Sequence, residues 1–588
     1  MAKVTAVHTK RVLSGGKRNI ANAERDCHRK FQRLGFSLPL SILSIQHELG
    51  EEVLTTNWVK VSHWLKYLVT TVPSVLGSPT TRLEEQCKTF WHFYRYKEPN
   101  HVVYQSGKDL GKCLPLNLYG DEGRGPKRAL YLEMTFETAF GVFDHEGPTC
   151  DCSTKLLKVP RRMVPDCQAE PFGCDTEVVG KMTTNLKGHS YLSKHLIFGL
   201  PAYLYKAHPE VLQTHLRLLS EDMRGLYEHG IRIGDSAWYG ICVGMKGDMK
   251  FYAETTCNFN RSFANLGRKN ESMMCYLRHA GAEQYPFEEV DDIPSWTQSV
   301  GLTRPWLANE TPHLATVQFH SLGHQEAMFV LDPFHVMKVG LSRDVCGSLI
   351  VLLCRLSFFD YADDESRDIE TRLQRAHGCF KLWCADQRKS PGLRSFTKAF
   401  MNAKTFAMTP WSNSKGSDST LLLKFLSFYL GLLLATDPQN KQDFLRVARS
   451  VVDNIITMHR IMESHGLFLD KKCAQLLYVK MMLVAKGYHL LAQHALNFGM
   501  VGFGVKPKYH SLKHMAFDIR MQILRGAPYI VNPNINTCES NEDHVGKVST
   551  LARRVSARTI GYRVIQRYFL KSKALFTRHK KKYGKGLL

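Results

Sequence analysis

The stretch that decides the fold is LPLNLYGDEGRGPKRALYLEMTF, residues 114–136. An apolar run ends on Asp121 and Glu122, a turn rich in glycine and basic residues follows, and a second apolar run ends on Phe136. Two apolar runs separated by a glycine-rich turn are typical of neighbouring strands. We therefore predict two adjacent strands, with Asp121 at the end of the first and, as the alternative, with Asp121 as an ordinary turn residue.

A second apolar run, WYGICVGMKGD, ends on Asp248. Carboxylates that meet at one edge of a sheet repel each other unless a cation lies between them. Hard oxygen ligands with open positions suit Mg²⁺ or Mn²⁺, so Asp121 and Asp248 are candidate ligands for such ions. The alternative for Asp248 is a strand-end cap. Glu122 is excluded from the pair, because successive side chains of a strand point to opposite faces.

A third carboxylate is predicted near the start of a late helix, in CESNEDHVGKVSTLARR. Glu539 and Glu542 are three residues apart and so share one helix face, with Asp543 beside them. The alternative is that these acids only complement the positive end of the helix dipole.

The charge balance of the chain indicates a polyanionic partner. Its 588 residues hold 78 Lys and Arg against 54 Asp and Glu, a net charge of +24. Nucleic acid is the commonest such partner, although a basic protein without one is the alternative. Residues 547–588 carry 13 Lys and Arg and no acid. The candidate phosphate-binding residues there are Arg553, Arg554, Arg558, Arg563, Arg567, Lys580, Lys581 and Lys582.

Cysteine usage and the apolar segments predict a reducing compartment and no membrane span. The 16 cysteines are irregularly spaced, and residues 1–18 lack the apolar core of a signal peptide. Free thiols are therefore expected, with organelle targeting by the basic N-terminus as an alternative. The most apolar segment, residues 421–436, is short and contains Lys424, so it is predicted to be a buried helix.

The pattern of elements predicts an α/β protein whose sheet is interrupted by helices. Length favours two to four domains. The predicted divisions are a helical region 1–110, a first part of an α/β core 111–340 with a cysteine-rich insertion 141–180, a helical insertion 341–505, core completion with an acidic helix 506–570, and a basic tail 571–588.

The order of these motifs supports a family resemblance. YGDEG, then MKGDMKF, a long helical block and a late NED resemble the DDE/D transposases whose RNase H-like core is split by a helical insertion. The region before Asp248 is similar to that of the CACTA (En/Spm) type, and LDPFHVMKVG and KPKYHSLKHM resemble transposase-like proteins of dinoflagellates. The resemblance spans roughly residues 110–570.

This resemblance implies catalytic and metal-binding roles for Asp121, Asp248 and Glu542, which would hold two Mg²⁺ or Mn²⁺ ions. Glu539 remains the alternative third acid. Asp332, in DPFH, remains the alternative second acid, since it too follows an apolar run. Our preferred interpretation is that Asp332 and His335 give structural support near the site.

Two zinc sites are further hypotheses. Relatives of the CACTA type have Cys-x-x-Cys after the second aspartate, but this chain has Arg278 at the second position. Zinc accepts mixed sets of ligands, so Cys275, His279, His510 and His514 form one candidate set, against the alternative of hydrogen-bonded core histidines. Cys150, Cys152, Cys167 and Cys174 form the other, against the alternative of free thiols.

The function implied by the resemblance is metal-dependent cleavage and strand transfer of DNA in the nucleus, by a protein that assembles as a homo-oligomer. An inactive or domesticated descendant is included in this prediction. The alternatives are a nucleic-acid-binding protein that retains the fold without catalysis, and a nuclease acting on RNA or on hybrids. The predicted acidic trio favours an enzyme.

Overall fold

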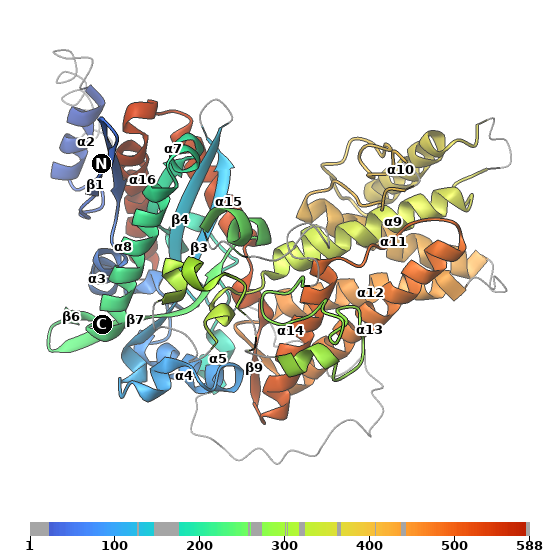
Figure 1. Cartoon of the computed structure of the whole chain (residues 1–588), viewed down its shortest axis with the longest axis horizontal. Helices are drawn as coiled ribbons and strands as arrows, with labels where there is room; N and C mark the ends of the chain where they lie inside the picture. Colours follow the sequence, from blue (N-terminus) through green and yellow to red (C-terminus); the bar gives the residue numbers. More distant parts are fainter. Residues whose placement is uncertain are drawn as a thin grey trace.

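The computed structural model describes residues 23–125, 129–145, 176–256, 259, 273–299, 302, 304–316, 324–361, 366–405, 407–436 and 443–583. These residues form two packed parts, a sheet domain and a helical block, each with its own apolar core (Figure 1). The α/β class predicted from the sequence is confirmed, with one large mixed sheet among many helices.

The sheet domain is built on seven strands in the order β1-β2-β5-β4-β3-β7-β6. All neighbours are antiparallel except β3 and β7, which run parallel. Beyond the strands, Phe329 adds one parallel bridge to Met245 of β7. The strands are β1 Leu43–Leu49, β2 Glu52–Trp58, β3 Cys113–Arg124, β4 Leu130–Thr138, β5 His195–Pro201, β6 Ile231–Ile233 and β7 Ser236–Lys246.

Helices cover both faces of this sheet. On one face, the His215 ring of α8 lies 4.5 Å from the Phe198 ring of β5. On the other, Phe576 of α16 lies 6.1 Å from His195 of β5, since His195 and Phe198 point to opposite sides of the strand. Figure 1 shows α8 in front of the strands and α16 behind them. The helices of this domain are α2 Ala23–Arg33, α3 Val61–Thr71, α4 Leu83–Lys97, α5 Thr176–Lys181, α6 Ser190–Ser193, α7 Ala202–Ala207, α8 Pro209–Glu228, α15 Glu539–Ala552 and α16 Ile560–Tyr583.

The helical block lies in the chain between β7 and α15 of the sheet domain, and it lies beside that domain in Figure 1. Its core extends to Ile519 of α14 and Ile530 of β9, beyond the boundary at residue 505 that the sequence predicted. Helix α14 belongs to the block because it packs against α13. The elements of the block are α9 Ser342–Arg355, α10 Ile369–Asp386, α11 Gly416–Thr436, α12 Asp443–Ser464, β8 Phe468–Asp470, α13 Lys471–Asn497, α14 Pro507–Leu524 and β9 Tyr529–Val531.

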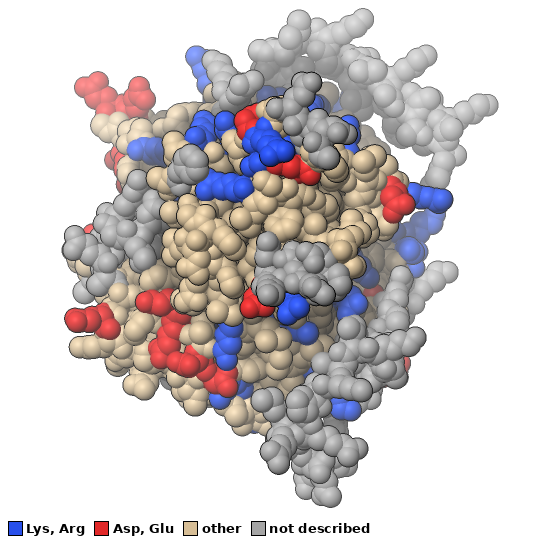
Figure 2. Space-filling model, turned by 90° about the vertical axis from the view of Figure 1, so that its right-hand side faces the viewer, with Lys and Arg blue, Asp and Glu red and all other residues tan. Residues whose placement is uncertain are grey.

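Helix α11 is long and apolar enough to cross a membrane by length and composition alone. In the structure one side of it is buried, with Leu422 and Leu426 in the core of the block, while Phe428 is 53% and Leu432 46% exposed. The helix predicted to be buried is therefore buried on one side only. Figure 2, which views the molecule from the side of the block, shows a broad uncharged area with basic residues gathered above it.

Two predicted divisions need correction. The region 1–110 is not purely helical, because β1 and β2 form a hairpin that extends the sheet from β5. The sequence pattern that indicates this hairpin is the alternation of apolar and polar residues over 43–49, followed by a turn at Gly50, whose φ is 66°. The basic segment after residue 570 is not a separate tail, because α16 continues to Tyr583 and buries Phe576 against the sheet.

A buried carboxylate, Glu137 of β4, connects several elements of the sheet domain. Its oxygens lie 2.7 Å from Lys194 Nζ, directly before β5, and 2.6 Å from Lys246 Nζ, at the end of β7. Asn541 Nδ2 of α15 lies 3.4 Å from it. Burial alone would raise the pKa of Glu137, but attraction to the two lysines outweighs burial and lowers this pKa to about 2. The pKa of Lys194 is lowered, because burial and the second ammonium together exceed the attraction of one shared carboxylate.

Replacing Glu137 by Gln is expected to lower the free energy of unfolding by about 3–5 kcal/mol, since two buried ammonium groups lose their counter-charge. Urea denaturation at neutral pH measures this loss, with the exposed Glu52→Gln of β2 as the control. The contribution of Glu137 is complete above the ordinary pKa of 4.5 and is lost as the pH falls towards 2. The difference between wild type and variant must therefore shrink in acid, and a difference independent of pH would contradict the ion-pair explanation.

Candidate active site

Asp121 and Asp248 lie at matching positions of the two parallel strands. Tyr119 of β3 pairs with Lys246, the last residue of β7, and each aspartate comes two residues later in the chain. Asp121 is not the last residue of β3, as the sequence predicted, because β3 continues to Arg124 through its pairing with β4. The alternative of a turn residue is also excluded. The two carboxylates therefore project from the sheet where β7 has ended and β3 still runs on.

Glycines make room around both aspartates. A Cβ at Gly120 would lie 2.2 Å from Cζ of Phe251, and one at Gly247 would lie 2.8 Å from Cδ1 of the same ring. On the far side of Asp121, a Cβ at Gly123 would lie 2.1 Å from Oγ of Ser549 in α15. These contacts explain the glycines of the opening stretch: Gly120 admits an aromatic ring, and Gly123 admits a helix.

Helix α15 brings Glu542 to Asp121. Glu542, Val545 and Ser549 share one helix face, and a Cβ at Gly123 would lie 2.6 Å from Val545 Cγ1 as well. The carboxylates of Glu542 and Asp121 are close enough to interact, since the charge of Glu542 raises the pKa of Asp121. Glu539 points elsewhere, since its carboxylate lies 2.7 Å from Lys338 Nζ. Among the two candidates, Glu542 is therefore the acid that joins Asp121.

Glu122, excluded by strand alternation, indeed lies on the other face of β3. The hydroxyl of Tyr205, from α7, donates a hydrogen bond to it. The Asp121 carboxylate is held instead by the Tyr119 hydroxyl at 3.1 Å and by the Glu122 backbone N–H at 2.6 Å.

Asp332 and His335 support this site from the segment that leads into α9, where Asp332 precedes the π-helix Phe334–Leu341 and His335 lies in it. The Asp332 carboxylate accepts the backbone N–H of Phe334 at 2.8 Å and that of Cys538, the residue before α15, at 2.9 Å. It also lies 2.5 Å from Nδ1 of His335, whose Nε2 lies 3.5 Å from a carboxylate oxygen of Glu542. With its oxygens occupied in this way, Asp332 anchors the start of α15 and is a weaker candidate than Asp248 for the second metal ligand.

The three carboxylates Asp121, Asp248 and Glu542 are called the acidic cluster below, and the pKa values of two of them, Asp121 and Glu542, are raised. Burial and the charges of Glu542 and Asp248 raise the pKa of Asp121 well above its ordinary value. Burial also raises the pKa of Glu542. Burial alone would lower the pKa of His335, but the hydrogen bond and charge of Asp332, with the charges of Glu542 and Asp248, raise it to about 9. An imidazolium therefore faces carboxylates that repel one another, and a cation bound among them would relieve that repulsion.

Three other groups of side chains are compact enough to hold a metal ion. Among the described residues, each group brings its ligand atoms within 4.8 Å of one another, and the acidic cluster is not one of these groups. They are Cys275 with His510 and His514, Asp332 with His335 and Cys538, and His465 with Asp470 and Cys473. The sequence analysis missed Cys538 and the whole third group, although the spacing Asp-x-x-Cys in residues 470–473 was a signal.

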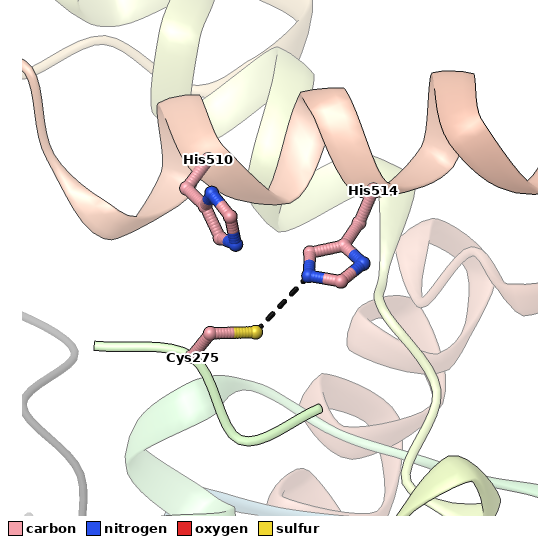
Figure 3. A group of neighbouring side chains, drawn as sticks. All are labelled: Cys275, His510 and His514. Carbon is pink, nitrogen blue, oxygen red and sulfur yellow. Dashed lines mark hydrogen bonds between the residues drawn. The ribbon is translucent and has the colours of Figure 1, made fainter. Parts of the chain in front are cut away.

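The Cys275 cluster, of Cys275, His510 and His514, is buried between a loop and helix α14 (Figure 3). The two histidines stand one helical turn apart and point to the same side, where Cys275 Sγ lies 3.1 Å from His514 Nε2. Trp296 packs against both rings. His279, predicted as a fourth ligand, is not in the cluster, and its ring lies 6.2 Å from that of Tyr285. The other predicted zinc set, Cys150, Cys152, Cys167 and Cys174, lies outside the described residues.

The predicted phosphate-binding residues divide by exposure. Arg563 and Arg567 are half-buried on α16, and Arg567 donates to the carbonyl of Arg554 at 2.9 Å. Lys580 donates to the carbonyl of Thr71 at 2.9 Å. The exposed members are Arg553, Arg554, Arg558, Lys580, Lys581 and Lys582. The exposed arginines begin 11 residues after Glu542, about 16 Å along the axis of α15.

Comparison with known proteins adds no family to this description. No protein-family model matches the chain, and no curated protein is significantly similar to it. The function is therefore argued from the geometry and chemistry of the site.

Replacing Gly123 by Ala is expected to lower the free energy of unfolding by about 1–3 kcal/mol, because the added methyl group meets Ser549 and Val545 and forces α15 outwards. Gly546→Ala is the matched control, since a Cβ there has no neighbour within 4 Å and alanine favours the helix. Thermal unfolding followed by circular dichroism compares the two. Equal effects of both substitutions would rule out a tight contact at Gly123.

Asp121→Asn is expected to raise the melting temperature of the metal-free protein at neutral pH. The folded-state pKa of Asp121 is raised, so the wild type loses stability as the pH rises from the ordinary value of 3.8 through the folded-state value. The amide removes that loss. Scanning calorimetry with EDTA or with Mn²⁺ provides the measurement: Mn²⁺ should stabilise the wild type and not the variant, whereas an equal response to Mn²⁺ would count against a metal at Asp121.

Proposed function

We propose that this chain is a metal-dependent enzyme that cleaves and joins DNA, with an RNase H-like core of the DDE/D transposase type. The strand order β5-β4-β3-β7, with three antiparallel strands and β7 parallel to β3, supports this interpretation of the sheet. The helical block separates β7 from α15, in the position that a helical insertion has in the proposed family.

The observation that carries the proposal is the convergence of the acidic cluster. Asp121 and Asp248 come from adjacent parallel strands, and Glu542 comes from a helix that reaches β3 only because Gly123 has no side chain. These residues are separated by up to 421 positions in the chain, yet the charges of Glu542 and Asp248 raise the pKa of Asp121, and the charge of Asp248 raises the pKa of Glu542. A structural role alone does not explain why three mutually repelling carboxylates are kept together.

The donor set fits Mg²⁺ or Mn²⁺, because all three candidate ligands are carboxylates. Such ions, when bound, activate a hydroxyl nucleophile and stabilise the leaving oxygen of a phosphodiester. Asp121 and Asp248 would hold the ions from the sheet and Glu542 from α15. His335, protonated below a pKa of about 9, orients the Glu542 carboxylate and is itself held by Asp332. The Cys275 cluster, with one thiol and two imidazoles, fits Zn²⁺ in a structural role.

The DNA partner is inferred from charge. The net charge of +24 favours a polyanion, and Arg553 and Arg554 are exposed directly after the helix that carries Glu542. Phosphate groups bound there would hold a DNA backbone close to the acidic cluster. The proposal includes a nuclear location and a homo-oligomer, as expected for an enzyme that joins DNA ends.

Nicking of supercoiled plasmid in the presence of Mn²⁺ tests the proposal. The wild type is expected to nick, and Asp121→Asn, Asp248→Asn and Glu542→Gln should each reduce the rate by at least about 100-fold, because each removes a metal ligand. Glu539→Gln is the matched control on the same helix, since Glu539 is bonded to Lys338, and it should retain activity.

Two other outcomes have clear meanings. Salt-sensitive binding of DNA by all variants, without nicking by any of them, would favour the non-catalytic DNA-binding protein. Cleavage of RNA or of RNA–DNA hybrids in preference to plasmid would favour the nuclease alternative.

A further inference from the structure

The turn between α12 and α13 carries a further cluster, in HGLFLDKKC, residues 465–473, in which His465 and Cys473 are buried and Asp470 is not. His465 follows α12, Asp470 ends β8 and Cys473 lies in the first turn of α13. A ring nitrogen of His465, a carboxylate oxygen of Asp470 and Sγ of Cys473 all lie within 4.8 Å of one another. We call these three residues the His465 cluster.

His465 has a buried nitrogen without a partner. The residue is only 8% exposed, and its Nδ1 lies 2.7 Å from the carbonyl oxygen of Ile461. A carbonyl accepts a hydrogen bond, so Nδ1 carries the proton and Nε2 has the free lone pair. Nε2 is buried and has no hydrogen-bond partner among the described residues, an arrangement that is unfavourable for a lone pair removed from water. Histidines that bind metals show this same arrangement, with one nitrogen donating to a carbonyl and the other free for the ion.

The positions of Asp470 and Cys473 can be explained without a metal ion, but that explanation leaves out His465. Asp470 caps α13 by accepting the backbone N–H of Cys473 at 2.9 Å, and its carboxylate is also hydrogen-bonded to the Cys473 thiol. Cys473 is 2% exposed. A helix cap accounts for Asp470 and Cys473, yet it leaves the buried lone pair of His465 without a function.

We propose that His465, Asp470 and Cys473 bind a structural Zn²⁺ ion. One imidazole, one carboxylate and one thiolate are ligand types that zinc accepts together. The Cys473 thiol loses its proton when the ion binds, and the proton passes to solvent. Water would fill the fourth position. The imidazole of His145, in the sheet domain, is close enough to His465 to interact with it electrostatically.

The position of the cluster gives this ion a role in joining the two parts of the protein. Leu467 N–H donates to the carbonyl of Met182 in the sheet domain at 2.9 Å, and a Cβ at Gly466 would lie 2.2 Å from that oxygen. Asn532 Nδ2 donates to the carbonyl of Gly466 at 2.9 Å. Asn532 begins the segment that leads into α15, so a rigid turn at His465 stabilises the approach to the acidic cluster.

Zinc content of the full-length chain, measured by mass spectrometry of the metal, tests the proposal. Cys473→Ser and His465→Gln should each lose one zinc equivalent relative to the wild type. Cys384→Ser is the matched control, because Cys384 is another buried thiol of the helical block that belongs to none of the metal-compatible groups among the described residues, and it should lose none. Circular dichroism verifies that each variant is folded.

Cobalt substitution separates this site from the Cys275 cluster. In a Cys275→Ser background, Co²⁺ should give a thiolate charge-transfer band in the near ultraviolet, and this band should weaken when Cys473→Ser is added. Folded variants of Cys473 and His465 with unchanged zinc content would overturn the proposal. If neither variant folds, the test uses the Cys275→Ser protein treated with a zinc chelator. An unchanged melting temperature after this treatment would also overturn the proposal.

Discussion

A single buried carboxylate, Glu137, holds the elements that carry the acidic cluster. One of its lysine partners, Lys246, is two residues before Asp248, and Asn541, directly before Glu542, also contacts it. Its other partner, Lys194, directly precedes β5. A buried ion pair is stabilising only in a well-defined geometry, because any loosening leaves charges without partners. The positions of β4, β5, β7 and α15 are therefore linked through one residue.

The acidic helix is positioned by two further contacts that complement this network. Asp332 accepts the N–H of Cys538 and so anchors the start of α15, while Gly123 allows the middle of the helix to touch β3. Between these contacts the chain leaves the sheet domain, builds the helical block and returns. The turn at His465 and the pair of strands β8 and β9 join the block to the segment before α15.

Local patterns made a substantial part of this arrangement predictable. The strand around Asp121, the strand before Asp248 and the helix of Glu542 follow from apolar runs, glycines and acidic residues within short windows. The hairpin of β1 and β2 was missed although its alternation was visible, because its place beside β5 depends on a distant strand. The predicted end of the helical block at residue 505 was also wrong, because α14 packs into the core of the block and a local pattern does not show which core a helix joins.

The sequence by itself determined the α/β class, the basic charge and a short set of candidate acids, because these depend on residue type and short-range periodicity. Only the tertiary structure decided that Glu542 rather than Glu539 joins Asp121, that Asp332 anchors a helix, and that His465 meets Cys473. Each of these choices depends on which side of an element faces a neighbour that is distant in sequence. That orientation is selected by packing and by the partnering of buried charges, which act only once the chain has folded.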